Sequence, residues 1–80
     1  MSYQLIGYRP NHQQMKEMVG HYLFRISDGI ITKAYIVGLK INQLTNKWEF
    51  VITGNKENEP LFKTIKSAKR YAKKNNIELI

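Results

Sequence analysis

The chain has 80 residues, with 13 lysines and arginines against 6 aspartates and glutamates, which gives a formal net charge of +7. It contains no cysteine, so disulfide bonds and thiolate zinc sites are excluded. Its two histidines, His12 and His21, are too few for a closed structural zinc site, and we expect no metal and no cofactor. This length predicts one small domain over residues 1–80.

The first quarter of the chain predicts a short strand and a short helix. Residues 2–9 are rich in tyrosine and aliphatic side chains, which favours a strand. Residues 11–19 favour a helix, because Asn11 is a good N-cap and Gln14 stands at the N3 position of a capping box. We expect this helix to end at Gly20.

Three strands joined by two short turns are predicted for the middle of the chain. Residues 21–26 are rich in aromatic side chains, and the segment 27–29 (Ser-Asp-Gly) suits a tight turn. Residues 30–42 follow as a long strand, residues 43–46 as a hairpin loop and residues 47–53 as the third strand. Strands in this order form an antiparallel meander.

Alternation along the second and third of these strands predicts which side chains share a face. We expect a bulge or a close contact at Gly38. On the second strand the predicted apolar face consists of Tyr35, Val37, Leu39 and Ile41. On the third strand Glu49 is expected to point outward, and the residues expected to point inward are Trp48, Phe50 and Ile52.

A loop and a helix are predicted for the C-terminal third. Residues 54–60 are polar and punctuated by glycine and proline, which favours a loop. Thr64 is expected to cap a helix that runs to about Asn75, with Asn75 and Asn76 as its C-terminal cap. Residues 77–80 are expected to form a short final strand or a packed tail. Helical spacing gathers four residues on one apolar side: Ile65, Ala68, Tyr71 and Ala72.

Together these elements predict an α+β fold. We expect a three- to four-stranded antiparallel sheet, arranged as a meander, with a short N-terminal helix. The basic C-terminal helix is expected to pack on one face of this sheet through its apolar side, which leaves its charged side towards solvent.

Nearly all of the excess positive charge lies in one segment. Residues 63–74 hold six basic residues and no acidic one, whereas the rest of the chain has seven basic and six acidic residues. A local field of this kind steers anionic partners. The candidate binding residues are Lys63, Lys66, Lys69, Arg70, Lys73 and Lys74.

The residues that could carry catalysis are few and scattered. The glycines form no phosphate-binding loop. Asp28 lies in a predicted turn, and Glu57 and Glu59 lie in a predicted loop without the pocket that acid–base catalysis needs. We therefore expect no enzymatic activity.

The basic helix favours nucleic-acid binding. Lysine contacts act mainly as point charges on the phosphate backbone, which predicts salt-sensitive binding to DNA or RNA with weak sequence specificity. Tyr22, Phe24 and Tyr35 could stack unpaired bases if they are exposed, or they belong to the core of the sheet. A second hypothesis is a protein-interaction module, such as an accessory or inhibitor protein encoded by a mobile element, that docks on an acidic protein surface.

The order helix, three strands, helix from Asn11 onward resembles the double-stranded RNA-binding domain. That resemblance implies phosphate contacts from the start of the last helix, where the counterparts are Lys63, Lys66, Lys69 and Arg70. The chain departs from that family because residues 59–64 (Glu-Pro-Leu-Phe-Lys-Thr) replace its glycine-rich lead-in and tight basic cluster. The three strands and the helix are also similar to the arm-site DNA-binding domains of phage-type integrases, which implies that the sheet reads DNA.

The sequence also predicts a location and an oligomeric possibility. The first nine residues hold no apolar run of signal-peptide length, and the longest apolar stretches are far too short to span a membrane. We expect a cytoplasmic protein that does not bind membranes. Pairing of a free sheet edge could form a homodimer.

Overall fold

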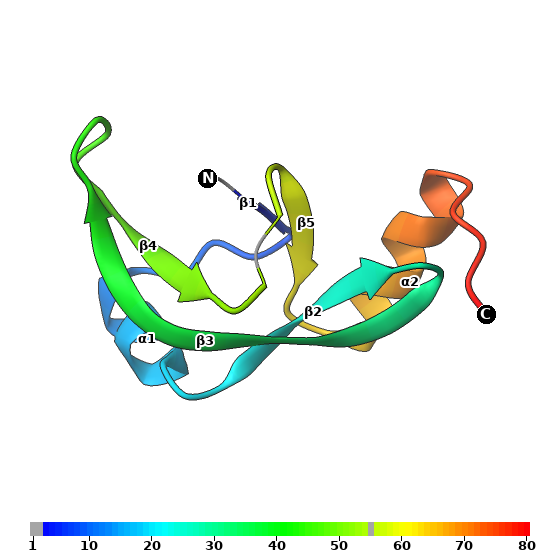
Figure 1. Ribbon diagram of the computed structural model, residues 1–80, viewed down its shortest axis with the longest axis horizontal. Helices are drawn as coiled ribbons and strands as arrows, with labels where there is room; N and C mark the ends of the chain where they lie inside the picture. Colours follow the sequence, from blue (N-terminus) through cyan, green and yellow to red (C-terminus); the bar gives the residue numbers. More distant parts are fainter. Residues whose placement is uncertain (1–2, 55) are drawn as a thin grey trace.

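Two helices and five strands make up the part of the chain that the computed structural model describes, residues 3–54 and 56–80 (Figure 1). The α+β class is confirmed. Residue 2 of the predicted first strand and residue 55 of the predicted loop lie outside the described residues. In chain order the elements are β1 (Tyr3–Ile6), α1 (His12–Met18), β2 (Tyr22–Ser27), β3 (Ile30–Asn42), β4 (Lys47–Ile52), β5 (Glu59–Phe62) and α2 (Ile65–Lys74).

The sheet is mixed and has the strand order β1-β5-β2-β3-β4. Strand β5 pairs in parallel with β1 and meets β2 in antiparallel orientation at Phe24 and Phe62. The predicted antiparallel meander is therefore correct for β2, β3 and β4 but incomplete, because β1 and β5 extend it to five strands. Residues 59 and 60, predicted as the end of a loop, begin β5 instead. Glutamate and proline disfavour strands locally, and β5 forms because β1, from the far end of the chain, supplies its partner.

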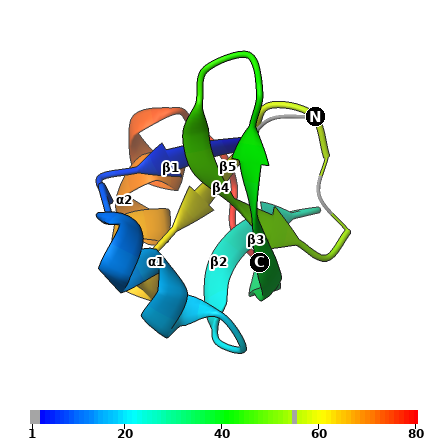
Figure 2. The same ribbon diagram turned by 90° about the vertical axis from the view of Figure 1, so that its left-hand side faces the viewer.

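Strand β3 serves both halves of the sheet. Its residues 30–35 pair with β2, and its residues 36–42 pair with β4. At the start of the half that pairs with β4, between Ile36 and Gly38, the register shifts by one residue at Val37, which confirms the predicted bulge. A bulge bends its strand and increases the local twist. The sheet curls at this place, as Figure 1 and Figure 2 show from two directions.

The sequence predicted that one apolar face of β3 packs on the core, and this prediction is wrong. The inward side chains before the bulge are Ala34 and Ile36, which are buried. The extra residue at the bulge then shifts the alternation by one, so that Leu39 packs against the core. The other three members of the predicted face are exposed to solvent: Tyr35, Val37 and Ile41.

The main core lies inside the curl. It consists of Met15, Leu23, Ala34, Ile36, Phe50, Ile52 and Leu61, all buried. Tyr3 closes the open side, because its hydroxyl accepts a hydrogen bond of 2.6 Å from the Phe50 amide and so joins the two edge strands, β1 and β4. Trp48 lies on the inward side of β4 as predicted, where it lines a cavity with Tyr3 and Met15, but it is 40% exposed and so does not belong to the core. It stacks on His12 with ring centroids 4.6 Å apart, whereas Phe50 and Ile52 are buried as predicted.

The local signals at the helix ends are confirmed. Asn11 and Gln14 form both hydrogen bonds of the capping box, and the Thr64 hydroxyl accepts from the Ser67 amide. Asn75 caps α2, and Asn76 adopts the left-handed conformation (φ 55°), so that the Ile77 amide can return to the Ala72 carbonyl. Residues 77–80 form a tail instead of a strand; the Ile80 amide is bonded to the Gly29 carbonyl, but only Leu79 is half-buried and the other three residues are exposed.

An ion pair on the inner side of the sheet connects β2 with β5. Arg25 Nε lies 3.0 Å from Glu59 Oε1, and both side chains are largely buried. Arg25 also donates through Nη2 to the Thr53 carbonyl, at the end of β4. Since β5 meets β2 through a single residue pair of the ladder, this ion pair adds a second polar connection between the two strands.

Replacing Arg25 by alanine is expected to unfold much of the protein. It leaves the Glu59 carboxylate buried without a partner, which costs about 3–5 kcal/mol. A domain of this size has a net stability of only about 3–5 kcal/mol. Urea denaturation followed by circular dichroism measures the loss. The double variant Arg25→Met/Glu59→Leu removes both charges and should regain most of the stability; a single variant as stable as the parent contradicts the role of the ion pair.

Replacing Tyr3 by phenylalanine is expected to cost about 1–3 kcal/mol near pH 8, because the Phe50 amide loses its acceptor. Burial raises the pKa of the Tyr3 hydroxyl above 10.0, so the unfolded chain releases this proton first as the pH rises. The contribution of Tyr3 is therefore complete below pH 10 and declines above it. The stability difference between parent and variant should shrink as the pH rises past 10; a constant difference contradicts this assignment.

Candidate nucleic-acid interface

Helix α2 covers part of the outer face of the sheet. Its Ala68 and Ala72 are buried, and the ring of Tyr71 lies 5.1 Å from the ring of Phe62 on β5. The predicted apolar side of the helix is therefore correct for three of its four residues. Ile65 stays 46% exposed, because it lies in the first turn, where fewer neighbouring side chains cover it.

The opposite side of α2 carries the positive charge. All six predicted cations, from Lys63 to Lys74, are exposed, and none forms an ion pair with another residue in the ranges 3–54 and 56–80. The unneutralised field of a single sign is consequently available to a partner. This basic face consists of Lys63, Lys66, Lys69, Arg70, Lys73 and Lys74.

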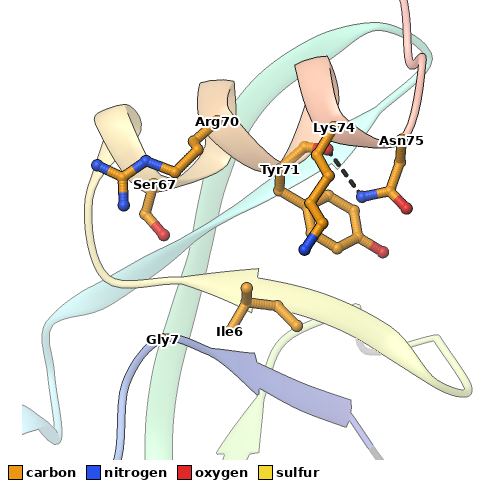
Figure 3. A pocket seen from close by; sticks show the side chains of 7 residues that line it. All are labelled: Ile6, Gly7, Ser67, Arg70, Tyr71, Lys74 and Asn75. Atoms are coloured by element: carbon orange, nitrogen blue, oxygen red, sulfur yellow. Dashed lines mark hydrogen bonds between the residues drawn. The ribbon is translucent and has the colours of Figure 1, made fainter.

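A groove of about 400 Å³ runs between α2 and β1 (Figure 3). Arg70 and Lys74 lie one turn apart on its helical wall, together with Ser67. In Figure 3 the Lys74 and Ser67 side chains point towards the strands, whereas Arg70 extends along the helix. Gly7 forms part of the opposite wall. Two cations and a hydroxyl on one wall suit an anionic group such as a phosphate.

The outer face also carries an aromatic patch, defined here as Tyr22, Phe24 and Tyr35. Tyr22 and Tyr35 are directly opposite each other on β2 and β3 and are 37% and 49% exposed. Tyr22 meets the rings of Phe24 and Tyr35 edge to face, at 5.4 and 5.9 Å. Phe24 is half-buried. The structure thus leaves two of the three predicted stacking residues open to solvent.

Lysines flank this patch on two sides. Lys33 is paired with Phe24 in the ladder, and its Nζ lies 4.6 Å from the centre of the Tyr22 ring. Lys63, just before α2, lines a cavity of about 240 Å³ together with Tyr22, Phe24, Met18 and His21. Lys63 therefore brings the basic face and the aromatic patch together.

Lys33 is a residue that the sequence reasoning did not include in the site. The sequence nevertheless contained the information that places Lys33 beside the patch. A two-residue turn at Asp28 and Gly29 fixes the hairpin register, and that register places Lys33 opposite Phe24 and Tyr35 opposite Tyr22. Nothing comparable in the sequence predicted the groove beside Ser67, because its two walls come from β1 and α2, which lie at opposite ends of the chain.

The described residues, 3–54 and 56–80, contain neither a metal-ligand cluster nor a membrane-spanning helix. Within these ranges no three His, Asp or Glu side chains lie close enough together to hold a metal ion. No helix there is both long enough and apolar enough to cross a membrane.

Comparison of the chain with protein-family models, with curated proteins and with solved structures finds no match. The interpretation of this surface therefore depends on its own residues.

Proposed function

We propose that this protein is a small non-enzymatic nucleic-acid-binding protein whose helix α2 contacts the phosphate backbone. The observation that carries the proposal is the basic face, six exposed cations without an ion-pair partner in the described residues, opposite the buried Ala68 and Ala72. A solvated helix face that serves solubility alone usually mixes both signs of charge.

The size of the basic face suits several phosphates. The ten residues of α2 span about 15 Å, at about 1.5 Å per residue. Arg70 and Lys74 can each engage a phosphate group at the groove, with the Ser67 hydroxyl as a further donor. Lysine supplies most of the remaining contacts as point charges, so the affinity should depend little on sequence.

Docking on an acidic protein surface is the alternative, and it would use the same cations. The nucleic-acid hypothesis accounts for more of the surface, because it also gives a role to exposed tyrosines that adjoin the positive charge. The experiments below decide between the two hypotheses.

Charge reversal on α2 is expected to abolish binding. The variant Lys66→Glu/Arg70→Glu/Lys73→Glu is compared with Lys16→Glu/Lys40→Glu/Lys47→Glu, whose three exposed lysines lie on α1, β3 and β4. Each replacement changes the charge by two, so both variants have a formal net charge of +1 instead of +7. Fluorescence anisotropy with labelled duplex DNA, duplex RNA and single strands at about 50 mM salt measures the affinity.

The control variant should keep most of the affinity, because its replaced lysines lie outside the basic face. Equal losses in both variants would show that overall charge, not α2, governs binding. Absence of binding to every nucleic acid by the unmodified protein, together with nuclease-resistant capture of an acidic protein, would favour the protein-interaction alternative.

Binding is also expected to weaken steeply with salt. If two to five phosphates are neutralised, the logarithm of the affinity for duplex DNA falls against the logarithm of salt concentration with a slope of about −2 to −4.5. The charge-reversed α2 variant should lose most of this slope. A slope near zero for the unmodified protein would contradict backbone contacts as the main source of affinity.

A further inference from the structure

We infer that the ligand of this surface is single-stranded nucleic acid, whose unpaired bases stack on Tyr22 and Tyr35 while its phosphates continue past Lys63 onto α2. This inference rests on the proposed function and specifies its substrate class. It combines two observations, the exposed aromatic patch and the lysines that border it.

The two tyrosines do not form part of the core. They lie on the outer face, opposite the inward side chains of Leu23 and Ala34, and the core inside the curl does not include them. Neither Tyr22 nor Tyr35 has a hydroxyl hydrogen bond within residues 3–54 and 56–80. Flat rings that stand on a sheet and are exposed to solvent provide a platform on which a base can stack.

The charge around the patch suits a nucleic-acid strand. Lys33 supplies positive charge on β3, and Lys63 supplies it just before α2. A strand whose bases stack on the patch therefore has a cation near its phosphates on both sides of the patch. None of the residues that line the cavity between Lys63 and Tyr22 is acidic. One carboxylate, that of Glu17, lines the neighbouring cavity beside Lys63.

Lys33 now lies over the ring of Tyr22, in the place that a base would take. An exposed cation–π contact is weaker than the stacking of a base on an aromatic ring, so a base displaces the ammonium. The flexible lysine side chain then reaches a phosphate of the same strand. Tyr35, which is 49% exposed as a residue, can offer its ring to a second base.

A duplex cannot use this platform, because its bases are already stacked on one another and a flipped base costs the energy of unstacking. A duplex can still touch the cations of α2. The structure therefore predicts two components of affinity: a charge component shared by all nucleic acids, and a stacking component that requires unpaired bases.

The experiment compares four labelled probes of twelve nucleotides or base pairs: oligo-dT, oligo-rU, a DNA duplex, and an abasic strand that has the phosphates of oligo-dT without its bases. We expect oligo-dT to bind more tightly than the abasic strand by about 5- to 150-fold for each stacked base. Oligo-rU, which differs from oligo-dT in its 2′-hydroxyls and in lacking the thymine methyl group, tests whether single-stranded RNA binds as well. This part of the experiment needs no variant.

Variants then locate the platform. Tyr22→Leu/Tyr35→Leu keeps apolar side chains but removes the rings, and should bring the affinity for oligo-dT down to that for the abasic strand. Tyr22→Phe/Tyr35→Phe keeps the rings and should retain the affinity. The matched control is Trp48→Leu, which removes an exposed ring from β4, away from the patch. Thermal melting by circular dichroism verifies that each variant is folded.

The outcomes separate the two proposals. Equal affinity for oligo-dT and the abasic strand overturns the stacking inference, while loss of that binding on charge reversal of α2 still supports the proposed function. Loss of oligo-dT binding in Trp48→Leu, with none in the tyrosine variant, also overturns the inference. Absence of binding to all four probes overturns the stacking inference, and if duplex RNA also fails to bind, the proposed function is overturned as well.

Discussion

The ion pair between Arg25 and Glu59 fixes the start of β5, and the placement of the candidate site depends on that strand. Glu59 is the first residue of β5, and Phe62, its last, forms the single ladder pair that joins the strand to β2. Lys63 follows at once, and α2 begins two residues later. An error in the placement of β5 would therefore move the basic face away from the tyrosines of β2 and β3.

The curl of the sheet divides the side chains into two populations. Those inside the curl form the main core, and the hydroxyl of Tyr3 joins its two edges. Those outside are covered by α2 only over β5 and part of β2, where Phe62 packs against the helix. The uncovered remainder holds the tyrosine pair. The short helix α2 thus accounts for both the basic face and the exposed tyrosines. Its cations point to solvent, and it is too short to cover the aromatic rings.

Local signals in the sequence were reliable where the structure is decided by neighbouring residues. The capping box of α1, the turn at Asp28 and Gly29, the bulge beside Gly38 and the caps of α2 are all correct. The errors concern contacts between distant segments. Strand β5 contains Glu59 and Pro60 and exists through its pairing with β1. Trp48 follows the alternation of β4, but the core ends before reaching it.

The sequence by itself determined that the positive charge is concentrated in residues 63–74 and lies on one side of a helix, because helical periodicity and caps are properties of consecutive residues. The hairpin register that places Tyr22 opposite Tyr35 was also encoded locally. Only the tertiary structure decided that these two features share the outer face, with Lys63 and Lys33 beside the rings. That arrangement depends on β5, which is positioned by strand pairing and a buried ion pair between residues far apart in the chain.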